Sequence, residues 1–185
     1  LRVIPFYVAF IHTAKGAKIL EINSRPGDPE IQNILPIIKD DFVDVCFNLI
    51  NGALKQIGLE EKATVTIYKT PPSYGGYINT FPELVNKNEI GTPVNLDEAY
   101  KLADVYGENI RIYPGSMELG DDGRNYALSS RAVCVVGIAD NLQAARECSL
   151  HGINAIRGGA LWNRKDIASK EHLTRSIEHM TRLRG

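Results

Sequence analysis

Three polar side chains alternate near the start of the chain: Glu21, Asn23 and Arg25. Successive side chains of a strand point to opposite faces, so Glu21 and Asn23 share one face if residues 17–23 are extended. Their α-carbons would then lie about 6.5 Å apart. A carboxylate and an amide oxygen at that separation can both reach one hard cation, and Mg²⁺ prefers oxygen ligands, which phosphate and water complete. The spacing is compatible with a metal–phosphate site.

Arg25 keeps the same parity if the backbone stays extended, which would place a guanidinium beside the phosphates that such a metal binds. That arrangement suits phosphoryl transfer, in which catalysis consists mostly of positioning and charge neutralisation. The same residues also fit a solvated strand face that ends in the turn Pro26-Gly27, and on spacing alone the two interpretations stand even. Asp28 fits a helix N-cap equally well, and a helix dipole favours Glu30 in a first turn.

A hairpin is predicted to carry this row. Residues 3–11 and 17–23 are rich in strand-forming residues, and a short polar stretch over 12–16 separates them. Two such runs with a short connection favour an antiparallel pair. The sequence therefore predicts a partial antiparallel sheet that displays Glu21 and Asn23.

Helices are expected after the row. Asp28 and Pro29 suit the N-cap and the first position of one helix. A longer helix is predicted over residues 40–56, because its apolar side chains recur at helical spacing and Gly58 follows it. We expect this longer helix to pack on the sheet.

The composition changes near residue 60, and a small α+β module is expected beyond it. A loop rich in Pro and Gly covers 70–80, a turn covers 120–123, and Asp140 with Gln143 has the form of a capping box. We expect the last two helices to share one face of the module's sheet. The expected strands are 63–69, 109–113 and 132–138, and the expected helices are 97–105, 140–151 and 170–183.

Composition and charge narrow the functional classes. The 185 residues are 44% hydrophobic and 23% charged, with a formal net charge of −1, which argues against a nucleic-acid or membrane surface. Cys46, Cys134 and Cys148 have no metal or redox spacing and are expected to be buried free thiols in the cytoplasm. Because the chain opens at Leu1 directly into an apolar run, we expect it to be part of a longer protein.

The ten residues from Glu21 to Glu30 resemble a segment of the phosphoribosylamine–glycine ligase family, which lies in the ATP-grasp superfamily. The extension Gly27-Asp28-Pro29-Glu30 is the most specific part of the resemblance. Three later motifs follow in the family's order over nearly the whole chain. They are Ser73-Tyr74-Gly75-Gly76-Tyr77, Arg131 with the apolar run Ala132-Val133-Cys134-Val135-Val136, and Trp162-Asn163-Arg164-Lys165-Asp166-Ile167.

The resemblance implies a role for each residue of the row. Glu21 and Asn23 would be ligands of Mg²⁺ or Mn²⁺. Arg25 would be catalytic, and Arg25 and Asp28 would hold the phosphate and the glycine or acyl-phosphate end of the site. The implied reaction uses ATP to join glycine to 5-phosphoribosylamine, giving glycinamide ribonucleotide, ADP and phosphate in purine biosynthesis. No nucleic-acid or membrane partner is expected.

The resemblance also implies the architecture. Residues 1–59 would be the C-terminal part of an ATP-grasp domain, and residues 60–185 a small α+β C-terminal domain. The rest of the parent chain, with the N-terminal and most ATP-binding elements, would be the partner of this portion. We therefore expect this portion alone to be inactive.

Several positions depart from the family's pattern. Pro26, Ser130 and Ala168 replace its usual Phe, Gly and Gly, and Ile78-Asn79 stands where it has Pro-Gly. Gly75-Gly76 fits a phosphate cradle and a simple turn about equally. Two other functions stay open: a non-catalytic docking module that keeps the ligase fold, and another ATP-grasp ligase that joins a different acid and amine.

Overall fold

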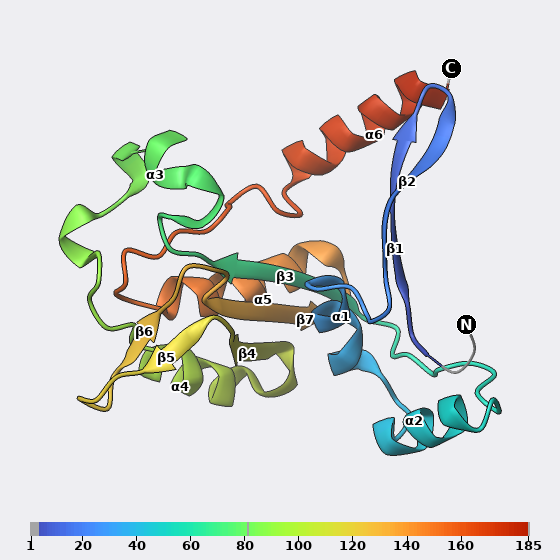
Figure 1. Ribbon diagram of the computed structural model, residues 1–185, viewed down its shortest axis with the longest axis horizontal. Helices are drawn as coiled ribbons and strands as arrows, with labels where there is room; N and C mark the ends of the chain where they lie inside the picture. The colour runs from blue at the N-terminus through green and yellow to red at the C-terminus, as the bar shows by residue number, and fades with distance from the viewer. Residues whose placement is uncertain (1–3, 81, 185) are drawn as a thin grey trace. The chain divides into compact units, whose positions relative to one another are not determined.

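The computed structural model describes residues 4–80 and 82–184, which form two compact units (Figure 1). Unit 1 comprises the chain up to residue 62 together with the chain from residue 170 onward, and unit 2 comprises residues 63–169. The predicted domains, 1–59 and 60–185, stay a prediction, and the compact units differ from them by placing the last helix in unit 1. Helices combine with antiparallel strand pairs, which confirms the predicted α+β class.

A long β-hairpin opens unit 1, as predicted (Figure 1). Strand β1 (Tyr7–Thr13) pairs antiparallel with β2 (Gly16–Asn23), and Val3, where the first strand was expected to begin, lies outside the described residues. The register places Tyr7 opposite Asn23, and it shifts between Ala9 and Phe10. The hairpin thus brings the end of β2 beside the start of β1.

Two short helices and one 3₁₀ turn follow the hairpin: α1 (Glu30–Ile34), η1 (Leu35–Ile37) and α2 (Phe42–Ile50). Asp41 caps α2, because its side chain accepts hydrogen bonds from the backbone N–H groups of Val43 and Asp44, at 2.8 and 3.3 Å. The predicted helix over 40–56 is too long.

The early end of α2 has a local cause. The backbone N–H of Gly52 bonds the carbonyl of Leu49, and Gly52 has a φ of +67°, a conformation that ends helices readily when glycine adopts it. The N-cap prediction for α1 is also shifted by one residue. Pro29 occupies the N-cap position, so α1 begins at Glu30.

A three-stranded antiparallel sheet forms the centre of unit 2, with strand order β3-β7-β4. Its strands are β3 (Ala63–Lys69), β4 (Ile110–Pro114) and the central β7 (Val133–Ala139). Each lies within one residue of its predicted range. A second hairpin joins β5 (Met117–Leu119) to β6 (Asn125–Ala127) through the predicted turn, in which the Gly123 N–H bonds the Gly120 carbonyl at 2.9 Å.

Helices α4 (Asp97–Tyr106) and α5 (Leu142–Ala155) pack with this sheet around one hydrophobic core. Helix α5 approaches β7 closely, because a Cβ placed on Gly137 would lie 1.9 Å from the carbonyl oxygen of Ala145. The buried hydroxyl of Ser149 donates to the carbonyl of Val135 at 3.0 Å. Small residues at the contact therefore let the helix backbone rest directly on the central strand.

The predicted capping box at the start of α5 is wrong by one residue. Asn141, not Asp140, is the N-cap, and its side-chain oxygen accepts from the N–H of Ala144 at 2.9 Å. The Gln143 side chain instead donates to Glu147 one turn later, at 2.8 Å. Helix α5 also continues four residues beyond its expected end.

The last helix, α6 (Lys170–Arg184), belongs to unit 1 and not to the compact unit that contains the three-stranded sheet. The expectation that it covers a face of that sheet stays a prediction. None of the described residues of α6 is buried, although Leu173, Ile177 and Met180 recur at helical spacing along one side of the helix. The remaining short elements lie in unit 2. They are η2 (Tyr74–Gly76), α3 (Tyr77–Thr80), η3 (Pro82–Leu84), η4 (Lys87–Glu89) and η5 (Gly107–Asn109).

The three cysteines are free thiols. Cys134 is buried as expected, whereas Cys46 and Cys148 are only half-buried. Within residues 4–80 and 82–184, no helix combines the length and the apolar character that crossing a membrane requires.

Candidate active site

The end of β2 brings Glu21 and Asn23 together, as their alternation predicts. The side-chain N–H of Asn23 donates to Glu21 Oε1 at 3.1 Å, so the two side chains lie on one face of the hairpin. Glu21 is exposed and Asn23 is half-buried. Antiparallel pairing with β1 fixes both positions, because Glu21 lies opposite Ala9 and Asn23 opposite Tyr7.

This pair offers hard oxygen donors to a divalent cation. The bond between the two side chains engages the amide nitrogen of Asn23, and the amide oxygen is the atom that would coordinate. Within the described part of the chain, no group of three or more His, Cys, Asp or Glu side chains is placed to hold a metal. Two oxygen donors suit Mg²⁺ or Mn²⁺ if phosphates and water supply the remaining ligands.

Arg25 lies beyond the end of β2, because the strand stops at Asn23 and the chain bends. The extended backbone expected to carry Arg25 on the same face therefore does not persist. Its guanidinium donates instead to the carbonyl of Pro26 at 2.8 Å. Asp28 accepts a hydrogen bond from the side chain of Gln32 at 3.3 Å. The catalytic and substrate-binding roles of Arg25 and Asp28 stay predictions.

Sequence reasoning missed a contact between β1 and α1. The hydroxyl of Tyr7 donates to Glu30 Oε1 at 3.1 Å. Partial burial, this hydrogen bond and the negative charges of Glu30 and Glu21 together raise the pKa of Tyr7. Gly27 is buried beside the pair, where a Cβ would lie 2.5 Å from Glu30 Oε2 and 2.7 Å from the Tyr7 ring. A glycine directly before Asp28 is a sequence signal for a close approach at that position, but it does not indicate which side chains make it.

An apolar cavity of about 710 Å³ opens next to this contact. Tyr7, Gly27 and Glu30 form part of its wall, and side chains of α2 form another part. The predicted packing of the long helix on the sheet is thus wrong, since a cavity lies between α2 and the base of the hairpin. The apolar lining consists mainly of Pro5, Phe6, Ile31, Ile34, Leu35, Ile38, Phe42, Val45, Leu49, Ile50, Leu54 and Ile57.

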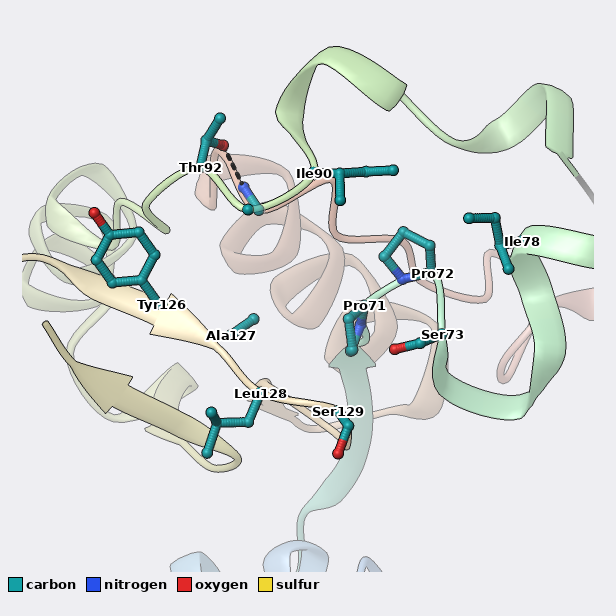
Figure 2. A pocket seen from close by; sticks show the side chains of 12 residues that line it. Pro71, Pro72, Ser73, Ile78, Ile90, Thr92, Tyr126, Ala127, Leu128 and Ser129 are labelled. Atoms are coloured by element: carbon teal, nitrogen blue, oxygen red, sulfur yellow. Dashed lines mark hydrogen bonds between the residues drawn. The ribbon is translucent and has the colours of Figure 1, made fainter.

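Unit 2 has a cavity of its own, of about 380 Å³, beside the loop that follows β3 (Figure 2). Figure 2 shows Pro71, Pro72 and Ser73 on one side and the segment after Tyr126 on the other. The Thr92 hydroxyl accepts from the backbone N–H of Gly159 at 3.0 Å, which joins two of the walls. Among the described residues, no charged side chain lines this cavity of unit 2.

The neighbouring Gly75 and Gly76 have φ values of +63° and +73°, which only glycine adopts without strain. They form a tight turn, and the phosphate-cradle interpretation of these residues stays a prediction. Ala168, which replaces a family glycine, also has a positive φ of +52°. The departure at Ala168 therefore places an alanine where the backbone favours glycine.

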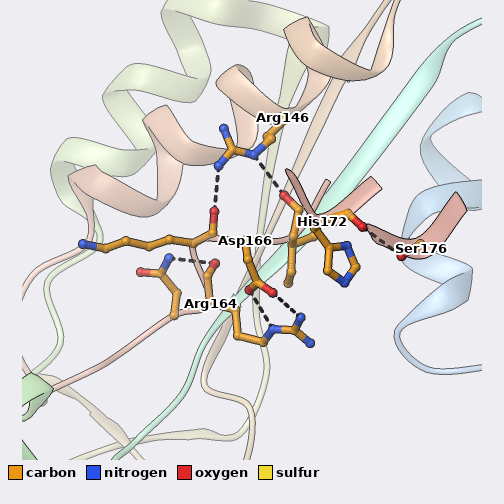
Figure 3. Close-up of polar contacts among 8 residues, drawn as sticks. Arg146, Arg164, Asp166, His172 and Ser176 are labelled. Carbon is orange, nitrogen blue, oxygen red and sulfur yellow. Dashed lines mark hydrogen bonds and ion pairs between the residues drawn. The ribbon is translucent and has the colours of Figure 1, made fainter. Parts of the chain in front are cut away.

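Side-chain contacts tie the segment around Asp166 to α5 (Figure 3). Arg146 donates from Nε to the carbonyl of Ile167 at 3.0 Å and from Nη2 to that of Lys165 at 2.6 Å. The Arg164 guanidinium donates two hydrogen bonds to the carboxylate of Asp166, from Nε at 2.9 Å and from Nη2 at 2.7 Å. Because both carboxylate oxygens of Asp166 accept from Arg164, the geometry favours a structural role for Asp166 over a catalytic one.

Curated relatives match the chain over nearly its full length. It is 38% identical over 182 residues to the phosphoribosylamine–glycine ligase of Methanocaldococcus jannaschii, covering 96% of this chain and 37% of the relative. It is 36% identical over 179 residues to the enzyme of that name from Thermococcus kodakarensis, covering 97% and 37%. It is 33% identical over 182 residues to the Methanosarcina barkeri enzyme of that name, with the same two shares. The chain thus spans little more than a third of the length of these relatives.

No sequence-family model matches the chain. A solved structure shares its fold: the crystal structure of phosphoribosylamine–glycine ligase from Thermotoga maritima aligns with a TM-score of 0.61 at 19% identity. That alignment covers 88% of this chain and 36% of the crystallised one. The curated relatives and the shared fold agree with the motif resemblance, and the chain matches the C-terminal portion of phosphoribosylamine–glycine ligase.

Proposed function

We propose that this chain is the C-terminal portion of an enzyme that joins glycine to 5-phosphoribosylamine, using ATP and releasing ADP and phosphate. The single observation that carries the proposal is the match of 96% of the chain to curated enzymes of this name. The placement of Glu21 and Asn23 on one face of a hairpin supports it independently, because the geometry was inferred from alternation alone.

The chemistry needs an activated carboxylate, since a carboxylate oxygen is a poor leaving group. ATP supplies a phosphoryl group to glycine, and the amine then displaces phosphate from the acyl phosphate. In this proposal Glu21 and Asn23 hold a divalent cation that neutralises charge on the transferred phosphoryl group. Arg25 and Asp28 hold the phosphate and the glycine or acyl-phosphate end of the site. Mg²⁺ and Mn²⁺ both suit the oxygen donors.

The partner in this proposal is the rest of a longer ligase chain. The apolar cavity and the exposed apolar side chains of unit 1 support it, because soluble proteins rarely leave such surfaces uncovered. Glu21 and Asn23 would form one wall of a site whose remaining walls belong to that partner. We therefore expect the 185-residue portion alone to be inactive, and we propose a cytoplasmic location, which the free thiols support.

The test is ligase activity of the full-length protein that carries this sequence, measured as glycinamide ribonucleotide formed from glycine, 5-phosphoribosylamine and ATP. Glu21→Ala and Asn23→Ala should each lower kcat at least about a hundredfold if they hold the catalytic metal. Glu98→Ala is the matched control, because Glu98 is an exposed carboxylate in unit 2 that pairs with a surface lysine, Lys101, at 2.8 Å. It should leave turnover unchanged.

Other outcomes separate the two alternatives. No ligation by the wild-type full-length protein with any acid and amine would favour a non-catalytic docking module. Ligation of a different acid–amine pair, with glycine and 5-phosphoribosylamine rejected, would favour another ligase of the superfamily. Normal metal-dependent turnover in both variants would remove Glu21 and Asn23 from their assigned roles.

A further inference from the structure

A clasp of three residues spans the gap between β1 and α1. Tyr7 begins β1, Glu30 begins α1, and Gly27 is buried between their side chains. The Tyr7 hydroxyl donates to Glu30 Oε1 at 3.1 Å. We call these three residues the Tyr7–Glu30 clasp. It joins positions 23 residues apart in the sequence, so it fixes the end of the hairpin against the start of the first helix.

The clasp has room only for glycine at its centre. A Cβ on Gly27 would lie 2.5 Å from Glu30 Oε2, 2.7 Å from Tyr7 Cδ2 and 2.9 Å from Tyr7 Cε2, all shorter than real Cβ contacts. The carbonyl of Gly27 in turn accepts from the N–H of Ile31 at 2.9 Å. The backbone at Gly27 is therefore held from the strand side by the ring and from the helix side by a hydrogen bond.

The segment between Asn23 and Gly27 is thus anchored at both ends. Its first end is Asn23, which pairs with Tyr7 in the hairpin register. Its second end is Gly27, which the ring of the same Tyr7 covers. One tyrosine contacts both ends of the bend that carries Arg25, and that bend begins at one of the proposed metal ligands.

We propose that Tyr7 is a positioning residue that sets the geometry of the Glu21–Asn23 pair and of the bend carrying Arg25, acting through Glu30 and Gly27. This inference rests on the proposed function, because it assigns the clasp to the same metal–nucleotide site. Tyr7 itself donates no ligand to the metal. Its hydroxyl keeps the Glu30 carboxylate and the turn at Gly27 in one arrangement, so that the donors on β2 are preorganised.

The test measures the Mg²⁺ concentration that half-saturates ligation at fixed ATP in the full-length protein, together with the thermal midpoint. Tyr7→Phe removes only the hydroxyl and keeps the ring over Gly27. It should raise the half-saturating Mg²⁺ concentration about three- to tenfold, the size expected for one lost hydrogen bond. Glu30→Met, which removes the acceptor carboxylate, should act similarly. The double variant should be no worse than the more affected single variant, because both substitutions break the same contact.

Tyr106→Phe is the matched control. The Tyr106 hydroxyl bonds the ring nitrogen Nδ1 of His151 at 2.9 Å within unit 2, so this variant also removes one tyrosine hydrogen bond to a titratable side chain. Its half-saturating Mg²⁺ concentration should equal that of the wild type. A lowered thermal midpoint with an unchanged Mg²⁺ dependence in Tyr7→Phe would show a purely structural role and overturn the inference, as would strictly additive effects in the double variant.

The Glu21→Ala variant separates this inference from the proposed function. If Glu21→Ala is inactive and Tyr7→Phe behaves as the wild type, only the positioning role of Tyr7 is lost. If Glu21→Ala retains full metal-dependent turnover, the result contradicts both the assignment of Glu21 as a metal ligand and the positioning role inferred for Tyr7. If a Tyr7 variant does not fold, Glu30→Met, which removes the acceptor and leaves the Tyr7 ring over Gly27, decides the question by the same measurement.

Discussion

The two units of this chain differ in how many of their large apolar side chains are buried. In unit 2, Val65, Ile67, Val135 and Ile153 are almost completely buried in one continuous core between the sheet and its helices. In unit 1, only Ile37 and Val45 are buried apolar side chains among the residues that the structure describes. Unit 1 exposes many large ones: Phe6, Phe10, Ile11, Ile19, Leu20, Ile22, Ile34, Leu35, Phe42, Val43, Phe47, Ile50, Ile57 and Leu59.

The difference teaches where each unit obtains its stability. Burial of apolar surface is the main force that drives folding, and unit 2 contains a core that meets that need. A two-stranded hairpin with short helices does not, and isolated hairpins are marginal in water. Unit 1 nevertheless carries the proposed metal pair. The side chains proposed to do chemistry therefore lie on the unit whose core is incomplete.

The largest expected effect is on folding of the separated units. Residues 63–169 expressed alone should show a cooperative thermal transition, because the core of unit 2 lies within that range. Residues 1–62 expressed alone should show no cooperative transition and should bind a hydrophobic dye. Circular dichroism against temperature checks both. A cooperative transition of residues 1–62 would contradict the inference that unit 1 lacks a sufficient core of its own.

Truncation of one large apolar side chain should cost very different amounts in the two units. Ile153 is fully buried, so Ile153→Ala should lower the free energy of unfolding of unit 2 by about 2–5 kcal/mol. Phe47 is 60% exposed, so Phe47→Ala in this 185-residue chain should change stability by no more than about 0.5 kcal/mol.

Urea titration of the two variants measures this difference. In a full-length ligase Phe47→Ala should become costly if the partner portion covers α2. Equal costs in this chain and in the full-length protein would show that α2 faces solvent in both.

The two helix N-caps provide a smaller and better matched comparison. Asn141→Ala removes the cap of α5, and Asp41→Ala removes that of α2. Each should cost about 1 kcal/mol. Because α5 belongs to the cooperative core, the loss at Asn141 should appear in the global unfolding of unit 2. The loss at Asp41 should appear only as faster amide hydrogen exchange within α2, and slowed exchange there would contradict the comparison.

The smallest expected effect is a gain in stability. Ala168 has a φ of +52°, a left-handed conformation that costs a residue with a Cβ roughly 1–2 kcal/mol. Ala168→Gly should therefore stabilise unit 2 by up to about 1 kcal/mol, after allowance for the greater entropy of glycine in the unfolded chain. A shift of the urea midpoint to higher concentration, with an unchanged slope, is the expected result. A destabilised variant would indicate that the alanine methyl contributes packing that outweighs the strain.

The sequence predicts unit 2 better than unit 1 for the same physical reason. The strands over 63–69, 109–113 and 132–138 were each placed within one residue, because buried apolar runs between turn residues leave little choice of boundary. In unit 1 the long helix was overextended, since its apolar periodicity continues past Gly52 although the helix ends there. Periodicity predicts which face is apolar, but a left-handed glycine decides where the helix stops.

The sequence likewise predicted some features of the candidate site and not others. Alternation along one strand correctly placed Glu21 beside Asn23, because the pleat alone fixes that relation. It placed Arg25 wrongly, because the chain bends after Asn23. No local pattern could indicate that Tyr7 bonds Glu30, since the contact depends on the hairpin returning the start of β1 to the beginning of α1. The capping error at Asp140 was a choice between two adjacent residues that both make good caps.

The central claim is that Glu21 and Asn23 hold the metal ion. Its most direct test uses electron paramagnetic resonance to measure the binding of Mn²⁺ to the full-length protein in the presence of ATP. Manganese replaces magnesium at oxygen sites and reports its own coordination. The account predicts one tightly bound Mn²⁺ per chain in the wild type and in Glu98→Gln, and at least tenfold weaker binding in Glu21→Gln and Asn23→Ala. Equally tight binding in all four proteins would contradict the assignment of Glu21 and Asn23 as the metal pair.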